Sequence, residues 1–288
     1  MQNDKTLVIG ATGSIGAPLV QYLLEKGGKV KAATRRVEAY PTLPNVEAVY
    51  FDYDDPATIA PALSGVNRVF MLAAPTDPDA DQSLGRVIEL AGASGVERIV
   101  LVTSLRIKAP RDAGGFLWGE KALQESGIAY TILRPGWFMQ SFSSGFILAM
   151  IKQRNVLSLP AGQGRIGLID ARDIAACAAC ALTEPGHHGQ TYLLTGGETL
   201  GLLEIAQTIA EVRGHPLPYA DVNMEELQQI VAEGEGYPGP IEHMTPFFNA
   251  VRDGIWDVSF DTVAKLTGCP PISFAQFAKE QAAVWSCV

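Results

Sequence analysis

Near the start of the chain stands the stretch Thr6-Leu7-Val8-Ile9-Gly10-Ala11-Thr12-Gly13-Ser14-Ile15-Gly16. A short apolar run leads directly into a glycine-rich turn, and the helical pattern of residues 15–26 follows. In such a turn Gly10 permits the tight bend, Gly13 lets backbone approach a pyrophosphate, and Gly16 lets the helix pack close to the sheet. The free N–H groups that begin the helix can then bind phosphate. The stretch predicts a dinucleotide site, and a glycine turn without a ligand is the alternative.

The residues at the end of the next apolar run, residues 29–34, indicate whether the cofactor is NAD(H) or NADP(H). In sites selective for NAD, an acidic residue about 20 positions past the glycines bonds the ribose 2′-hydroxyl. Here Thr34 is followed by Arg35 and Arg36, and the first acidic residue is Glu38. A guanidinium fork matches a 2′-phosphate. We expect NADP(H) rather than NAD(H) beside these residues, and the alternative is a solvated surface pair of arginines.

A polar cluster follows the third apolar run, residues 46–51. Asp52 is expected to accept a hydrogen bond from the exocyclic amine of the adenine, with Tyr53 beside the ring. Asp54 and Asp55 are expected to cap the helix that comes next. Helix capping alone is the alternative explanation of the cluster.

Short apolar runs alternate with longer helical patterns through the first half of the chain, which is typical of a parallel sheet wound by helices. The expected strands are residues 6–9, 29–34, 46–51, 67–72, 98–103 and 130–134, and the expected helices are residues 15–26, 56–63, 85–93 and 119–126. The fourth strand ends in Leu72, Ala73 and Ala74, whose size leaves room for a cofactor at the crevice outside the strand ends. The fold class is therefore α/β, a Rossmann-type doubly wound parallel sheet.

The second half of the chain is less regular. It contains an irregular or hairpin excursion at residues 156–169, a helix at 171–182, a strand at 190–195 and helical patterns from residue 200 onward. We expect residues 1–155 to form the nucleotide-binding core. Residues 156–288 then form a smaller, mostly helical substrate lobe, from which residues 168–196 return to the core.

The composition of the chain argues against several classes of protein. The chain has 288 residues, of which 47% are hydrophobic, enough to bury a sizeable core. Its net charge of -9 argues against nucleic acid as a partner, because phosphate binding needs a basic surface. The start of the chain is polar, without a secretory signal, and polar residues interrupt the apolar stretch 137–151, which is shorter than the ~20 residues that span a bilayer. We expect a cytoplasmic protein without a membrane partner.

The cysteines and histidines point to no metal site. Cys177 and Cys180 form a C-x-x-C motif among alanines, and their interpretation as small buried residues is favoured over a redox or metal pair. His187 and His188 lie between glycines and are expected in an exposed turn. A third ligand for a metal is missing from this pattern.

Five motifs together resemble one family. They are Gly10-x-x-Gly13-x-x-Gly16, Thr34-Arg35-Arg36, Leu133-Arg134-Pro135-Gly136-Trp137-Phe138-Met139, Asp170-Ala171-Arg172-Asp173-Ile174-Ala175 and the run at residues 268–285. The chain resembles the NmrA-like atypical short-chain dehydrogenase/reductases, in particular the branch of ergot-alkaloid iminium reductases and triphenylmethane and quinone reductases. The resemblance implies a Rossmann core, a small C-terminal substrate lobe and an active site in the cleft between them.

The same resemblance implies which residues contact the cofactor. It implies phosphate contacts from Thr12, Ser14 and Ile15, and a 2′-phosphate contact from Arg35. It also implies that Pro135, Gly136 and Phe138 lie near the nicotinamide. We further expect Thr103, Ser104 and Lys121 to contact the cofactor.

One position departs from the wider superfamily. Typical members carry Tyr-x-x-x-Lys, in which the tyrosine donates a proton and the lysine lowers its pKa. Here Leu117 stands at the tyrosine position and Lys121 at the lysine position. Because leucine cannot donate a proton, the usual ketone-reductase mechanism does not fit.

We favour a reductase that delivers hydride to an acceptor needing little acid catalysis, such as an iminium, a quinone or a cationic dye. Four aromatic residues are candidates for the wall of a pocket that holds such a flat or bulky molecule, although each could equally be ordinary core. They are Trp118, Trp137, Phe138 and Phe142.

Two other interpretations stay open. In a carbonyl or enone reductase, Lys121 or a water that it holds would donate the proton, unless Lys121 only pairs with Glu125 one turn on. Alternatively, the chain binds NADP(H) without turnover, as a redox sensor that acts through a protein partner. The sequence leaves open whether the protein is a monomer or a homodimer.

Overall fold

The computed structural model describes residues 4–72, 80–105, 116–234 and 241–286. The chain divides into two compact units. The first comprises Met1–Pro135 and Arg172–Leu194, and the second comprises Gly136–Ala171 and Thr195–Val288.

The first unit is built on a seven-stranded sheet in which all neighbouring strands run parallel. In the order β10-β6-β5-β4-β1-β2-β3, its strands are β10 (Gln190–Leu194), β6 (Ala129–Pro135), β5 (Arg98–Val102), β4 (Arg68–Leu72), β1 (Lys5–Ile9), β2 (Lys29–Thr34) and β3 (Val46–Tyr50). The predicted Rossmann-type sheet is confirmed. The strand order reverses between β1 and β4, and ligands of such sheets bind at the carboxyl ends of the strands at this point.

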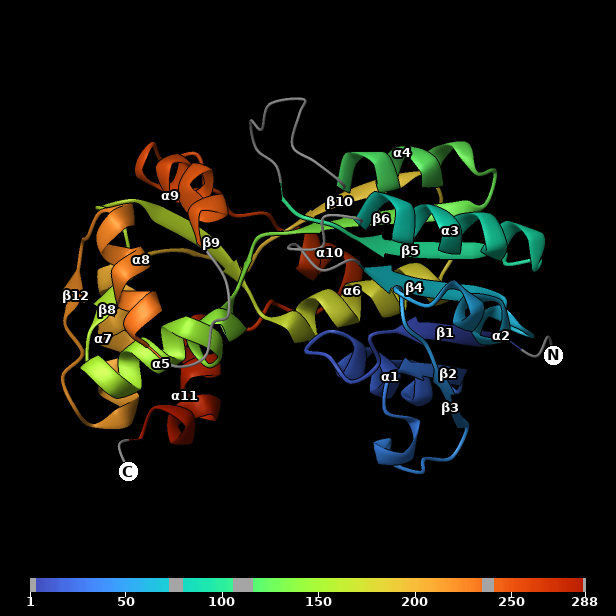
Figure 1. The fold of residues 1–288 in the computed structure, drawn as a ribbon, viewed down its shortest axis with the longest axis horizontal. Coiled ribbons are helices and arrows are strands. Elements are labelled where there is room, and N and C mark those ends of the chain that lie inside the picture. The colour runs from blue at the N-terminus through green and yellow to red at the C-terminus, as the bar shows by residue number, and fades with distance from the viewer. Residues whose placement is uncertain (1–3, 73–79, 106–115, 235–240, 287–288) are drawn as a thin grey trace. The chain divides into compact units, whose positions relative to one another are not determined.

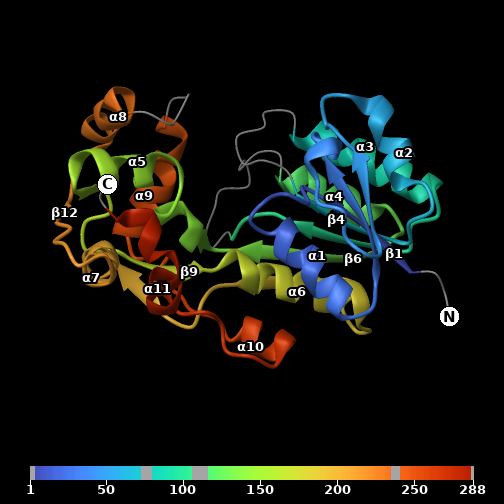
Figure 2. The same ribbon diagram turned by 90° about the horizontal axis from the view of Figure 1, so that it is seen from below.

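Helices cover both faces of this sheet (Figures 1 and 2). One face carries α2 (Ile59–Leu63), α3 (Ala80–Ala93) and α4 (Phe116–Glu125), and the other carries α1 (Gly16–Glu25) and α6 (Ala171–Thr183). Burial on both faces explains why strand residues such as Leu7-Val8-Ile9 and Ile99-Val100-Leu101 are apolar without alternation. Leu7, Met71 and Leu101 then pack with α2 to α4 side chains in one core.

Several boundaries differ from those predicted. The expected helix at 56–63 is a 3₁₀ turn, η2 (Pro56–Thr58), followed by the short α2, and a second 3₁₀ turn, η1 (Val37–Ala39), follows β2. The helices predicted to begin at residues 85 and 119 begin at Ala80 and Phe116. Asp79, a residue type favoured at the start of a helix, directly precedes Ala80, so the prediction placed this start late because it followed the apolar period alone.

The second unit combines small sheets with helices. Its strands are β7 (Trp137–Phe138), β8 (Leu157–Ser158), β9 (Arg165–Ile169), β11 (Thr199–Gly201) and β12 (Tyr219–Ala220), in the sheets β11-β9-β7 and β12-β8. Its helices are η3 (Met139–Phe142), α5 (Gly145–Arg154), α7 (Leu202–Arg213), α8 (Met224–Glu233), η4 (Glu242–Met244), α9 (Thr245–Arg252), α10 (Thr262–Thr267) and α11 (Phe274–Trp285).

The core of the second unit explains why it begins at Gly136, whereas the sequence placed the boundary near residue 155. Phe142, Ile147 and Ile151 are buried in one cluster with Phe274 and Trp285. The indole N–H of Trp285 donates to the carbonyl oxygen of Phe142 at 2.7 Å. Residues 136–154 therefore belong to the core that the C-terminal helix completes.

Across the residues with described structure, no helix combines the length and the apolar character that crossing a membrane requires.

Candidate cofactor-binding site

The turn between β1 and α1 requires glycine at two positions. Gly10 has φ of 75°, in the left-handed region. A Cβ atom on Gly16 would lie 2.1 Å from the carbonyl oxygen of Gly10, and one on Gly13 would lie 3.2 Å from the same atom. The predicted roles of Gly10 and Gly16 in a tight turn and in close packing therefore agree with the geometry.

The start of α1 offers backbone N–H groups as hydrogen-bond donors. Inside the turn, the N–H of Gly13 donates to Gly10 at 2.9 Å and that of Ala17 donates to Gly13 at 3.0 Å. Ile15 is the N-cap residue, and no side chain caps the helix. Thr12, Gly13 and Ser14 are exposed, whereas Ile15 is buried. Such an uncapped helix start, edged by glycine and hydroxyl side chains, fits the diphosphate of a dinucleotide.

Two arginines stand beside this turn at the carboxyl end of β2. Thr34 is buried and its hydroxyl accepts from the N–H of Arg36 at 3.1 Å, which shapes the chain as it leaves the strand. Arg35 and Arg36 are both exposed, and neither forms an ion pair with any residue of the described chain. Their role at a 2′-phosphate stays a prediction.

The end of β3 is organised by hydrogen bonds of its own. The hydroxyl of Tyr53 donates to the carbonyl oxygen of Leu72 at 2.8 Å, so it ties the end of β3 to the end of β4. Asp52 accepts from the N–H of Asp54 at 3.2 Å. Asp55 accepts from Ala57 at 3.1 Å and caps η2, as predicted, whereas Asp54 caps nothing described. Contacts of Asp52 and Tyr53 with adenine stay a prediction.

Ala73 and Ala74, which were expected at the cofactor, lie outside the described residues. Leu72 is half-buried at the end of β4.

A polar network holds the ends of β5 and β6. Thr103 follows β5 and donates from its hydroxyl to Glu120 at 2.7 Å. Glu120 also accepts from Arg134 of β6, from Nε at 3.0 Å and from Nη2 at 2.5 Å. Ser104 is half-buried beside it. Glu120 and Arg134 were absent from the predicted site, although a charged residue in the apolar strand that contains Arg134 was an available signal.

Lys121 points away from this network. Its ammonium lies 3.8 Å from the carboxylate of Glu125, the structural pairing named as an alternative, and 5.7 Å from the centre of the Trp118 ring. Trp118 is 64% exposed. Leu117 lies in α4, one turn before Lys121. These contacts leave the catalytic role of Lys121 a prediction.

The remaining candidates for a substrate pocket lie in the second unit. Trp137 and Phe138 form β7 and are half-buried. The Trp137 ring lies 5.2 Å from that of Phe142 and 5.0 Å from that of Phe247. Phe142 is fully buried in the core, so of these three candidates only Trp137 and Phe138 have exposed surface.

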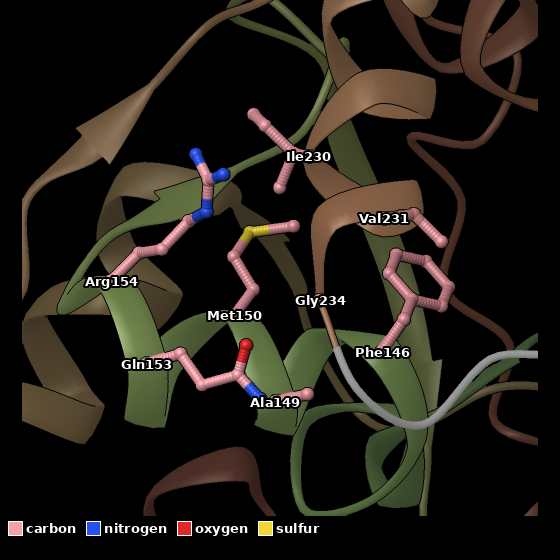
Figure 3. A pocket seen from close by; sticks show the side chains of 8 residues that line it. All are labelled: Phe146, Ala149, Met150, Gln153, Arg154, Ile230, Val231 and Gly234. Atoms are coloured by element: carbon pink, nitrogen blue, oxygen red, sulfur yellow. The ribbon is translucent and has the colours of Figure 1, made fainter.

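Among the hollows in the described part of the second unit are two that do not suit a flat apolar substrate. The one between α5 and α8, shown in Figure 3, has a volume of about 10 Å³, room for no more than a water molecule. The other has a volume of about 310 Å³, and its lining is glycine and polar or charged side chains, including Arg165, Arg252 and Asp257. Substrate pockets are mostly apolar and aromatic.

The remaining cysteine and histidine predictions have mixed outcomes. Cys177 and Cys180 are buried thiols, as predicted, and burial raises the pKa of each. The prediction that His187 is exposed is wrong, because the residue is 9% exposed and its Nδ1 lies 2.9 Å from the hydroxyl of Tyr192. No cluster of three or more potential metal ligands occurs in the part of the chain that the structure describes.

Comparison with known proteins shows to which family the chain belongs. A family model described as NAD(P)H-binding matches residues 10–185. The NAD(P)H azoreductase of Xenophilus azovorans is 34% identical over 285 residues, which cover 97% of this chain and 98% of that protein. Agroclavine dehydrogenase of Claviceps fusiformis is 30% identical over 82% of this chain and 83% of its own.

Among solved structures, triphenylmethane reductase of Citrobacter sp. complexed with NADP(H) has a TM-score of 0.81. It is 25% identical and covers 97% of this chain and 99% of its own.

Proposed function

The chain belongs to the NAD(P)H-binding family of NmrA-like atypical short-chain dehydrogenase/reductases, and on that premise we propose that it reduces an electrophilic cyclic or aromatic small molecule with NADPH. It is an NAD(P)H-dependent oxidoreductase that acts on a small molecule. The proposal adds the preference for NADPH and the class of acceptor, which is an iminium, a quinone or an enone.

The observation that carries the proposal is the pair of exposed guanidinium groups beside the glycine turn, neither of which forms an ion pair with a residue that the structure describes. Arg35 and Arg36 bring two positive charges to the strand end where the adenine ribose of a dinucleotide lies in this fold. An unphosphorylated ribose would leave both without a partner, whereas a 2′-phosphate offers them charge-assisted hydrogen bonds.

The proposed cofactor site follows the carboxyl edge of the sheet in the first unit. The turn from Gly10 to Gly16 binds the diphosphate, with Thr12, Ser14 and Ile15 in contact. Thr34, Arg35 and Arg36 bind the 2′-phosphate. The adenine lies beside Asp52 and Tyr53, and the nicotinamide lies near Thr103, Ser104, Lys121 and Pro135.

When bound, NADPH supplies the hydride. The residues of this chain then have to bind the acceptor, exclude water and manage any proton. Leu117 cannot donate a proton, so the acceptor either is already electron-poor, like an iminium carbon or a quinone, or takes its proton from water. Lys121 orients the nicotinamide ribose or holds that water.

The acceptor is proposed to be flat and apolar for two reasons. Trp137 and Phe247 present half-buried aromatic rings at edge-to-face geometry, which suit contact with another ring. The relatives named for an azo compound and for a triphenylmethane dye are both reductases. We accordingly assign cofactor binding to the first unit and substrate binding to the second.

The test is NADPH oxidation at saturating cofactor against quinones, azo dyes, cyclic iminium ions and triphenylmethane dyes, with saturated ketones as the contrasting class. We expect turnover with the electrophilic acceptors and little with the ketones. Tight NADPH binding without oxidation of any acceptor, together with a protein partner that binds only the loaded form, would contradict the proposal in favour of a sensor.

A further inference from the structure

A buried carboxylate joins three elements of the first unit. Glu120 of α4 is 3% exposed. Its Oε1 accepts from the Thr103 hydroxyl at 2.7 Å and from Nε of Arg134 at 3.0 Å, and its Oε2 accepts from Nη2 of Arg134 at 2.5 Å. The ion pair is therefore bidentate, a geometry that fixes direction as well as distance.

The three elements meet at the carboxyl edge of the sheet. Backbone bonds extend the pairing of β5 and β6 past the ends of the strands, from the N–H of Thr103 to Leu133 at 2.9 Å and from the N–H of Leu105 to Pro135 at 2.8 Å. Ser104 is held between these two bonds. Glu120 adds a side-chain bond from the helix to the same short segment.

The network also sets the rotation of α4 about its axis. Successive residues of a helix project about 100° apart. With the Glu120 side chain held inward against β5 and β6, the next residue, Lys121, projects outward beside Trp118.

We propose that Glu120 is a positioning residue for the nicotinamide end of the cofactor site, which it serves by holding α4, Thr103 and Arg134 together at the ends of β5 and β6. This inference rests on the proposed function, which puts the nicotinamide beside Thr103, Ser104 and Lys121. Glu120 itself touches neither cofactor nor substrate; it acts through Thr103 and Arg134.

A contribution to folding stability does not by itself explain why the protein buries the Glu120–Arg134 ion pair. Buried ion pairs carry a large desolvation cost, and apolar residues of similar volume commonly stabilise a core as well or better. The bidentate pair supplies what apolar side chains do not, namely one allowed orientation of the helix relative to the strand ends. An active site needs that orientation, because a displacement of about 1 Å can cost a factor of about 100 in rate.

Three variants separate positioning from folding. Glu120→Gln removes the charge and leaves Arg134 without its ion pair. Glu120→Leu combined with Arg134→Met replaces the ion pair with an apolar contact. This double variant is expected to fold even if the single variant is unstable, because no buried charge is left unpaired. Glu89→Gln, an exposed glutamate of α3, is the matched control.

Two measurements are made on each intact variant below its melting temperature. NADPH binding is followed by titration, and the emission of the bound nicotinamide reports its surroundings. Turnover is measured with menadione as the probe acceptor. We expect both the single and the double variant to bind NADPH with little change in Kd, to shift the nicotinamide emission towards that of free NADPH, and to lose kcat by roughly 10- to 100-fold.

The outcomes separate this inference from the function on which it rests. Glu89→Gln should match the wild type in every measurement. A folded double variant with wild-type nicotinamide emission and wild-type kcat would show that Glu120 is structural only, and would overturn the inference. A wild-type protein that binds no NADPH would instead overturn the proposed function, and the inference with it.

Discussion

Arg35 and Arg36 lie exposed at the end of β2, where the proposed 2′-phosphate would bind. We predict that Arg35→Asp combined with Arg36→Ala weakens NADPH binding and leaves NADH binding nearly unchanged. Hydrogen bonds to charged groups contribute about 1.5–3 kcal/mol each, so losing the contacts of both arginines raises the Kd for NADPH by roughly 100-fold or more. Calorimetric titration with each cofactor measures the two Kd values.

Arg86→Ala is the control for that variant, since Arg86 is an exposed arginine of α3 bonded only to Gln82 among described partners. It should leave both Kd values unchanged. Equal weakening of NADPH and NADH by the double variant would contradict the assignment of the pair to the 2′-phosphate.

Lys121 offers a second residue-level prediction. In the structure it makes an exposed pair with Glu125, and such pairs contribute about 0.3–0.5 kcal/mol to stability. Lys121→Ala should therefore leave the melting temperature nearly unchanged, yet lower kcat by about 100-fold or more if it takes part in proton transfer. Steady-state kinetics and thermal unfolding measure the two effects.

Glu125→Gln keeps the lysine and breaks only its ion pair, so this variant should turn over like the wild type. Full activity of Lys121→Ala would leave the residue with its structural pairing alone.

At the scale of single residues, the neighbouring sequence was sufficient to predict some features of the site and the core. The sequence alone predicted Gly16, the Asp55 cap and the buried Cys177, because each depends on neighbours within a few positions. Glu120 was missed because its partners, Thr103 and Arg134, lie 17 and 14 residues away and meet it only through the sheet.

At the scale of elements, the turn between β1 and α1 is the most sensitive junction. A methyl group on Gly16 would lie 2.1 Å from the Gly10 carbonyl oxygen, which is backbone and cannot rotate away. We predict that Gly16→Ala displaces α1, destabilises the protein by about 1–3 kcal/mol and weakens NADPH binding. Urea unfolding and NADPH titration measure both effects.

Gly85→Ala in α3 is the matched control. A Cβ atom there meets nothing within 4 Å, and alanine favours a helix by roughly 0.5–1 kcal/mol over glycine. The control should be as stable as the wild type or more so. A Gly16→Ala protein as stable and as tight for NADPH as the control would disprove the close approach of helix and turn.

The length of a strand determined whether its pattern of apolar and polar residues could be recognised in the sequence. The continuous apolar residues of β1 and β5, which are five residues long each, indicated a parallel sheet because strands buried on both faces need no alternation. Strands β7 and β8 span two residues each, too few to establish any period. The small sheets of the second unit therefore appeared only as an irregular excursion.

At the scale of the whole molecule, the division of the chain depends on contacts between distant segments. The apolar pattern of residues 136–154 is compatible with either unit. Its place in the second unit follows from packing in one cluster with residues of α7 and α11, which begin only at Leu202 and Phe274. Contacts at such separation leave no signal in a local window, which is why the sequence drew the boundary in a different place.

The stability of the first unit should depend on pH through the connection between α6 and β10. His187 in this connection is buried, its Nδ1 lies 2.9 Å from the Tyr192 hydroxyl, and its carbonyl oxygen accepts from Thr131 of β6 at 2.8 Å. Burial lowers the pKa of His187 below its usual 6.5, with Arg98 adding to the effect and the Glu184 carboxylate opposing it. The folded protein therefore favours the neutral ring.

A lowered pKa means that the unfolded chain binds a proton at a pH where the folded chain does not, so acid favours unfolding. The free energy of unfolding should fall as the pH drops below 6.5, the usual value for the group, and should stop falling through this residue below its folded pKa. We predict that His187→Gln flattens this dependence in urea unfolding between about pH 8 and about pH 5. An identical slope in His187→Gln and wild type would show that the buried imidazole does not set the acid sensitivity.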